Sequence, residues 1–163
     1  MTEAQRVAQL EFRLGVLDDP AVVELLAHHV ESARSETEPG SDHALDLDGL
    51  RNPDIRFWSV WQGEQLLGTG AWWHFEPGHG ELKSMHVVEA ARGRGIGSAM
   101  LQHLVDDAAA SGITRLSLET GSWAYFEPAV ALYRRHGFVE YEPFGDYVPD
   151  LNSIFMTREL TPS

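Results

Sequence analysis

A seven-residue turn rich in glycine and arginine offers the clearest chemistry in the sequence. It reads Arg92-Gly93-Arg94-Gly95-Ile96-Gly97-Ser98 and leads into a segment with helical periodicity. The first backbone N–H groups of a helix lack partners and carry the positive end of the helix dipole. Glycines let the backbone form a concave nest that a ligand can approach closely. The turn is therefore predicted to bind an anion such as a pyrophosphate, with Arg92 and Arg94 adding charge and Lys83 lying upstream.

Two other phosphate-binding motifs fit this turn less well. A Walker A loop needs Gly-Lys-Ser/Thr at the start of the helix, and that sequence is absent. A dinucleotide-binding turn would need its third glycine where Ser98 stands, and it normally follows an early strand of a parallel sheet. On these residues alone, a flexible loop that only caps the helix stays an open alternative.

The elements before the turn are predicted to form an antiparallel sheet. Three segments rich in β-branched and aromatic residues are separated by the turns Gln62-Gly63-Glu64 and Pro77-Gly78-His79-Gly80, and such tight turns join antiparallel neighbours. The predicted strands are 55–61, 66–75 and 81–88. Upstream, the pattern predicts a strand over 10–16, a helix from Pro20 to Val30, a loop over 31–42 and a short helix over 45–50.

The period changes after the turn. Met100, Leu101, Leu104, Val105 and Ala108 recur at helical spacing, which predicts a helix over 96–110 that ends at Gly112. A buried strand over 113–119 follows, and a strand–helix–strand crossover makes it parallel to its predecessor. The remaining predicted elements are a helix over 128–135 and strands over 138–141 and 153–160.

Composition narrows the classes of function. The chain has 163 residues, a formal net charge of −13 and no cysteine. Such acidity disfavours nucleic acid and anionic membranes as partners, and the missing cysteines exclude disulfides, thiolate nucleophiles and cysteine-based zinc sites. No apolar run is long enough for a membrane-spanning helix and no secretory signal is visible, so a cytoplasmic protein is expected.

Three segments of the sequence together resemble the GNAT superfamily of N-acyltransferases. The family pattern combines R/Q-x-x-G-x-G/A after the fourth strand with L-Y-x-x-x-G-F in the last helix, and both occur here in that order. The resemblance runs from about Leu10 to the end and is most specific from Glu81 to Tyr141. The segments are Glu81-Leu-Lys-Ser-Met-His-Val-Val, Arg92-x-x-Gly95-x-Gly97 and Ala131-Leu-Tyr133-x-x-x-Gly137-Phe138.

The resemblance implies one α/β (α+β) domain over residues 1–163. Its central sheet is expected to be mixed but mostly antiparallel and flanked by helices, with the fourth and fifth strands splayed apart. The cofactor implied is acetyl-CoA, whose pantetheine arm is expected to pair with the free edge of the fourth strand. The Val87 amide would then donate to the thioester oxygen. The cofactor-binding residues expected on this basis are Met85, His86, Val87, Arg92, Gly93, Arg94, Gly95, Ile96, Gly97 and Ser98.

Two residues are expected to be catalytic by the same resemblance. Tyr133 would act as general acid toward the leaving thiolate, and Glu81, at the start of the fourth strand, would accept a proton from the amine. Glu119 and His86 are alternative bases. Many family members carry Asn seven residues before the tyrosine, whereas this sequence has Phe126, so Thr120 or Tyr125 is expected to take over part of that role.

The expected reaction is direct acetyl transfer, in a ternary complex, to a primary amine of a small molecule or peptide. Acidic and aromatic residues in two segments, 36–48 and 143–153, suit a cationic amine and are expected to select it. A non-catalytic acyl-CoA sensor is the alternative, and a phosphoryl-transfer protein is a weaker one. The sequence leaves the acceptor open, and a homodimer is compatible with the resemblance.

Overall fold

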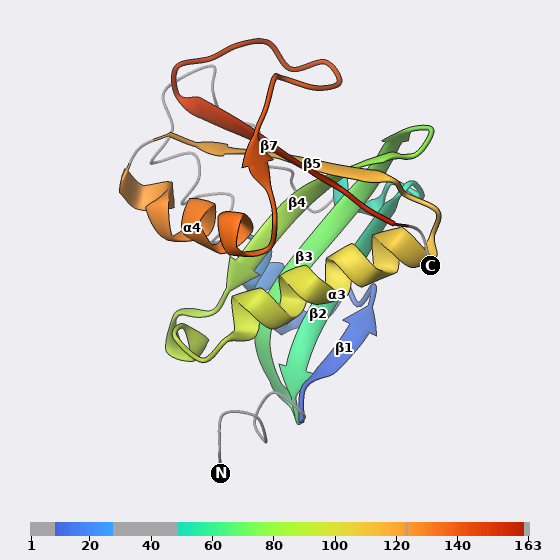
Figure 1. The fold of residues 1–163 in the computed structure, drawn as a ribbon. Coiled ribbons are helices and arrows are strands. Elements are labelled where there is room, and N and C mark those ends of the chain that lie inside the picture. The colour runs from blue at the N-terminus through green and yellow to red at the C-terminus, as the bar shows by residue number, and fades with distance from the viewer. Residues whose placement is uncertain (1–8, 28–48, 123, 162–163) are drawn as a thin grey trace.

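A mixed seven-stranded sheet forms the centre of the fold in the computed structural model, which describes residues 9–27, 49–122 and 124–161 (Figure 1). The strand order is β1-β2-β3-β4-β5-β7-β6. Every neighbouring pair is antiparallel except β4 and β5, which are parallel. The strands are β1 Glu11–Leu14, β2 Ile55–Gln62, β3 Gln65–Glu76, β4 His79–Val87, β5 Arg115–Gly121, β6 Val139–Glu140 and β7 Ser153–Glu159.

Helices lie on both faces of this sheet. Among the described residues, no helix is long and apolar enough to cross a membrane. The helical elements are a segment over 20–27, the 3-10 turns η1 Gly49–Arg51, η2 Glu89–Ala91 and η3 Ala124–Phe126, and the helices α3 Ile96–Ala110 and α4 Glu127–Arg135.

The predicted architecture is confirmed, although element bounds differ. β1 is Glu11–Leu14 instead of 10–16, and β6 is Val139–Glu140 instead of 138–141. β4 begins at His79 instead of Glu81, because His79 already pairs with Glu76 of β3 across the turn. β5 runs over Arg115–Gly121 instead of 113–119, since the amide of Thr114 is held by the carbonyl of Gly78 outside the strand ladder. The described part of the short helix predicted over 45–50 is the 3-10 turn η1. Val30, the loop 31–42 and residues 45–48 lie outside the described residues.

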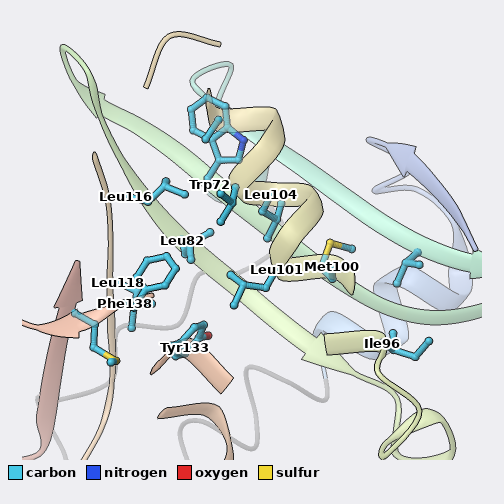
Figure 2. Packing of buried hydrophobic residues seen from close by; sticks show 14 of the residues in the cluster. Trp72, Leu82, Ile96, Met100, Leu101, Leu104, Leu116, Leu118, Tyr133 and Phe138 are labelled. Atoms are coloured by element: carbon cyan, nitrogen blue, oxygen red, sulfur yellow. The ribbon is translucent and has the colours of Figure 1, made fainter. Parts of the chain in front are cut away.

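The alternation of strand residues divides the core into two clusters. On one face, α3 packs Met100, Leu101 and Leu104 against Trp72 and Leu82, with β5, Tyr133 and Phe138 completing the cluster (Figure 2). On the other face, the helical segment 20–27 packs on residues of β2 and β3. That second cluster contains Val22, Leu25, Leu26, Leu50, Phe57, Trp61, Leu66 and Ala71.

The two parallel strands of the sheet pair over only a short length. β4 and β5 are in register from His79↔Arg115 to Glu81↔Ser117, and no further pair forms although both strands continue. Beyond this point β5 stays with β7 and β4 stays with β3, so the sheet opens between them (Figure 1). The predicted splay of the fourth and fifth strands is therefore present, and Glu81 marks where it begins.

Candidate functional site

The edge of β4 beyond Glu81 has backbone groups that β5 does not use. The amide of Val88, just after the strand, donates to the carbonyl oxygen of Leu67 at 2.9 Å, so that amide points toward β3. Successive amides of an extended chain point to opposite edges. The amide of Val87 therefore points away from β3, toward the opening between β4 and β5. This is the orientation that the predicted oxyanion donor requires.

A β-bulge in β4 changes which side chains face α3. The register with β3 shifts by one residue between Thr69↔His86 and Ala71↔Lys83, Ser84 has φ of 55°, and its carbonyl accepts a hydrogen bond from Thr69 Oγ1 at 3.0 Å. Bulges of this kind re-aim side chains. Leu82 faces α3, and the extra residue places Met85 and Val87 on that same face.

The glycine turn adopts the geometry of an anion nest. Gly93 and Gly95 both have φ of 78°, a left-handed conformation that costs other residues free energy, and Gly95 is the N-cap of α3. Ile96 is buried and fixes the start of the helix in the core. Arg94 Nη2 donates to Gln62 Oε1 at 3.0 Å, whereas Arg92 is exposed. The backbone amides of the turn and its two cations fit a pyrophosphate group.

Gly97 and Ser98 connect this turn to β4 and α4. A Cβ added at Gly97 would lie 3.3 Å from Leu132 Cδ2 and 3.6 Å from Val87 Cγ2, so the turn lies close to the edge of β4. Ser98 Oγ lies 2.7 Å from Nε2 of His136, which follows α4. Burial lowers the pKa of His136, and the charges of Arg158 and Arg135 lower it further. The imidazole beside Ser98 is therefore neutral near pH 7 and adds no positive charge to the turn.

Tyr133 lies on α4 with its ring in the core. It is 8% exposed and its ring contacts that of Phe138 edge-on, with the centroids 6.0 Å apart. Burial raises the pKa of Tyr133 to about 12. Its hydroxyl makes no hydrogen bond to the residues that the structure describes. A phenol held protonated in this way can donate its proton to a ligand.

Glu81 is a buried carboxylate at the point where the two strands separate. Tyr147 donates a hydrogen bond to Glu81 Oε2 at 2.6 Å, and Lys83 Nζ lies 3.1 Å from the same oxygen. No described residue donates a hydrogen bond to Oε1. Burial raises the pKa of Tyr147, as do the charges of Glu81 and Glu119 and the hydrogen bond to Glu81. Tyr147 is therefore a hydrogen-bond donor to Glu81 at neutral pH.

The two alternative bases differ in their surroundings. Glu119, on β5, accepts a hydrogen bond from Ser153 Oγ at 2.6 Å, and it lies close enough to Tyr147 for its charge to raise that pKa. His86 is paired with Thr69 in the β3–β4 register, beyond the bulge. Glu119 therefore stands across the opening from Glu81, on the same side as Tyr147, while His86 belongs to the segment of β4 nearer the turn.

Phe126 occupies space at the end of β5 that a side chain at Gly121 would need. A Cβ added at Gly121 would lie 2.1 Å from Phe126 Cδ2, and the ring of Tyr125 meets that of Phe126 edge-on at 4.9 Å between centroids. Tyr125 is about half exposed, and Thr120 is buried in β5. Phe126, which stands where many family members have Asn, is thus accommodated by a glycine, Gly121, at the end of β5. The expected roles of Thr120 and Tyr125 remain predictions.

One sequence expectation about charge is wrong. Lys83 does not join Arg92 and Arg94 but forms an ion pair with Glu81. Ala71, its partner in the register, belongs to the cluster on the face opposite α3, so Lys83 lies on that face too. Glu81 and Lys83 are two residues apart, the spacing that places side chains on one face of a strand, and this signal could have identified the pair.

The acidic residues expected over 36–48 lie outside the described residues.

Comparison with known proteins agrees with this geometry. A family model described as "Acetyltransferase (GNAT) family" matches residues 22–138. The uncharacterized N-acetyltransferases YsnE of Bacillus subtilis and YedL of Escherichia coli are 44% and 45% identical to this chain. The YsnE match covers 93% of this chain and 100% of that protein, and the YedL match covers 88% and 91%. A crystal structure from Klebsiella pneumoniae, described as an acyl-CoA N-acyltransferase, has a TM-score of 0.75 and 27% identity, covering 94% of this chain and 99% of its own.

Proposed function

The chain belongs to the acetyltransferase (GNAT) family of acetyl-CoA-dependent acyltransferases, and we propose that it acetylates a primary amine of a small molecule or peptide by direct attack in a ternary complex. The observation that carries this proposal is the early end of the β4–β5 ladder at Glu81↔Ser117. It leaves an open strand edge that leads from a buried carboxylate to the glycine turn.

Acetyl-CoA would be held by the edge of β4 and by the turn. The edge is formed by Met85, His86 and Val87, whose backbone would pair with the pantetheine arm as another strand would. The pyrophosphate would lie on the amides between Gly93 and Ser98 and beside Arg92 and Arg94. When bound, acetyl-CoA supplies an acetyl group activated as a thioester.

Three groups of the chain would promote the transfer. Glu81 Oε1 accepts a proton from the ammonium, which frees the nitrogen lone pair to form the C–N bond. The Val87 amide stabilises negative charge on the carbonyl oxygen. As the C–S bond breaks, Tyr133 donates its proton to the sulfur, and the second proton released by the nitrogen restores the phenol. Glu81 then releases the proton that it accepted to solvent, so charge and atoms balance over each turnover.

The test measures acetylation and cofactor binding in the same preparations. The wild-type chain is incubated with acetyl-CoA and a panel of primary amines, thiol release is followed, and the acetylated amine is identified by mass. We expect Tyr133→Phe and Glu81→Gln to lose about 100-fold or more in kcat while keeping their affinity for acetyl-CoA. Binding of acetyl-CoA without turnover of any amine would contradict the proposal and favour a non-catalytic sensor.

A further inference from the structure

Lys83 differs from every other basic residue of the chain. It is the only lysine in the sequence; the other eleven basic residues are arginines. Its side chain is 11% exposed and that of its partner Glu81 is 4% exposed, so the pair is removed from water. Taking an ammonium group out of water costs free energy that a single ion pair recovers only in part. A buried lysine at the mouth of the opening therefore calls for a reason beyond neutralising Glu81.

The ammonium group of Lys83 has donors left over. It carries three N–H groups, and Glu81 is its only hydrogen-bond or ion-pair partner among the residues that the structure describes. Its other neighbour is the face of Trp73, whose ring centroid lies 5.6 Å away. The aromatic face of Trp73 attracts the ammonium group but is not a conventional hydrogen-bond acceptor. The remaining N–H groups of Lys83 can therefore donate to an anionic group of a ligand.

The amine acceptor would meet this lysine when it meets the proposed base. Tyr147 and Lys83 both bind Oε2 of Glu81, which leaves Oε1 to receive the amine. An acceptor with only a positive charge would then bring a second cation beside Lys83. Like charges a few ångströms apart at a buried site repel each other. An acceptor that carries a carboxylate next to its ammonium group would cancel this repulsion.

We propose that Lys83 recognises the carboxylate of the acceptor, and that the acceptors of this enzyme are zwitterionic α-amino acids. In an α-amino acid the ammonium and carboxylate groups are attached to one carbon, which matches the adjacent placement of Glu81 and Lys83. Glu119 lies on the facing strand β5, close enough to Tyr147 for its charge to act there, so it adds negative charge on the side where the ammonium group would lie. This inference rests on the proposed acetyltransferase function and specifies its substrate class.

The test compares amino acids with their decarboxylated counterparts. L-phenylalanine is paired with phenethylamine and L-leucine with isoamylamine, and acetyl-CoA-dependent product formation is measured for each. We expect the wild type to have a kcat/KM at least about tenfold higher for the amino acid of each pair. Lys83→Met keeps the stem over Trp73 but removes the charge. Loss of the ion pair with Glu81 acts on both kinds of acceptor, so the informative quantity is the ratio of their kcat/KM values. The ratio of amino acid to amine is expected to fall about 10- to 100-fold, mainly through a higher KM for the amino acid.

A matched control exists on the far edge of the sheet. Arg13 of β1 pairs with Glu11 at 2.7 Å, two residues away, and lies over the ring of Trp61 at 4.4 Å. It therefore repeats the arrangement of a strand glutamate, a cation and a tryptophan at an exposed place. Arg13→Met should leave the preference between amino acid and amine unchanged.

A second measurement does not depend on any variant folding. Because the chain has one lysine, protein grown with ¹³Cε-lysine gives a single lysine side-chain resonance. L-phenylalanine should shift that resonance and phenethylamine should not. Equal turnover of amine and amino acid, with no selective shift, would overturn the role of Lys83 while leaving acetyl transfer intact. Turnover of no acceptor in either pair would overturn the acceptor class and count against the proposed function as well.

Discussion

Asp107 should be the polar residue whose removal most destabilises the fold among those that hold α3 on the sheet. Its Oδ2 accepts hydrogen bonds from Arg56 Nε at 2.8 Å, Trp58 Nε1 at 3.0 Å and Trp72 Nε1 at 2.9 Å, and its Oδ1 accepts from Arg56 Nη2 at 2.9 Å. The carboxylate lies in the last turn of α3, where a negative charge is unfavourable to the helix dipole. Its stabilising effect therefore comes from the contacts with β2 and β3.

The magnitude follows from what Asp107→Ala leaves behind. Trp72 is 2% exposed, so its N–H cannot reach water and loses its partner, which costs about 1–3 kcal/mol. The Arg56 side chain is 39% exposed and can be hydrated by water instead, so loss of its ion pair with Asp107 adds little to the cost. Alanine regains up to roughly 0.7 kcal/mol of helix propensity. We expect a net decrease of about 1–2 kcal/mol in the free energy of unfolding.

The pH dependence of this effect has a definite sign. Burial alone would raise the pKa of Asp107, but the hydrogen bonds from Arg56, Trp72 and Trp58 and the charge of Arg56 together lower it below its usual value of 3.8. A depressed pKa stabilises the folded state above the unfolded pKa, and that stability is lost as the pH falls through the folded value. The difference between wild type and Asp107→Ala should therefore be full at neutral pH and shrink below about pH 3.8.

Urea unfolding at neutral and acid pH measures this difference directly. The neighbouring Asp106 is a matched control, because it is exposed and bonds only to the exposed Gln102 in the part of the chain that the structure describes. Asp106→Ala should change the free energy of unfolding by less than about 0.5 kcal/mol. If Asp107→Ala were no more destabilising than Asp106→Ala, the contacts to the two tryptophans would not hold α3 as described.

Three further predictions concern the site. Gly95→Ala forces a residue with a Cβ into φ of 78° and should lower the free energy of unfolding by about 1–2 kcal/mol; calorimetric titration should show at least about tenfold weaker binding of acetyl-CoA. Because burial raises the pKa of Tyr133 to about 12, kcat should not decline near the usual tyrosine value of 10.0, and a decline there that Tyr133→Phe removed would contradict this. Gly121→Ala should be strongly destabilising in a thermal melt because its Cβ would collide with Phe126, and adding Phe126→Ala should recover part of the loss.

Local patterns in the sequence were sufficient to predict most of the fold. The helix over 96–110 has the bounds predicted from its apolar spacing, and the turns at Gly63 and Gly78 gave the antiparallel strands. The family resemblance is confirmed as well, and with it the splay of the fourth and fifth strands. These features depend on residues that are close together in the sequence or on a motif with fixed spacing.

The candidate site was harder to predict from the sequence than the fold, because it depends on long-range contacts. Tyr147 bonds to Glu81 from 66 residues away, and no periodicity links the two. No glycine or proline in the sequence marks the bulge at Ser84. The bulge nevertheless decides which side chains of β4 face α3. Lys83 was grouped with the arginines of the turn because proximity in sequence could not show the face of the sheet on which it lies. The roles of Tyr133, Glu81 and the cofactor-binding residues remain predictions.

Thermal unfolding in the presence of ligands tests the central claim, an acetyl-CoA site between the β4 edge and the glycine turn, most directly. A ligand that binds only the folded state stabilises it by about 2.7 kcal/mol at a hundredfold excess over its Kd. Acetyl-CoA and CoA should raise the melting temperature clearly, and ATP and NAD at the same concentration should not. No shift with either CoA species, or an equal shift with ATP, would contradict the claim and return the turn to a helix cap or to a site for another anion.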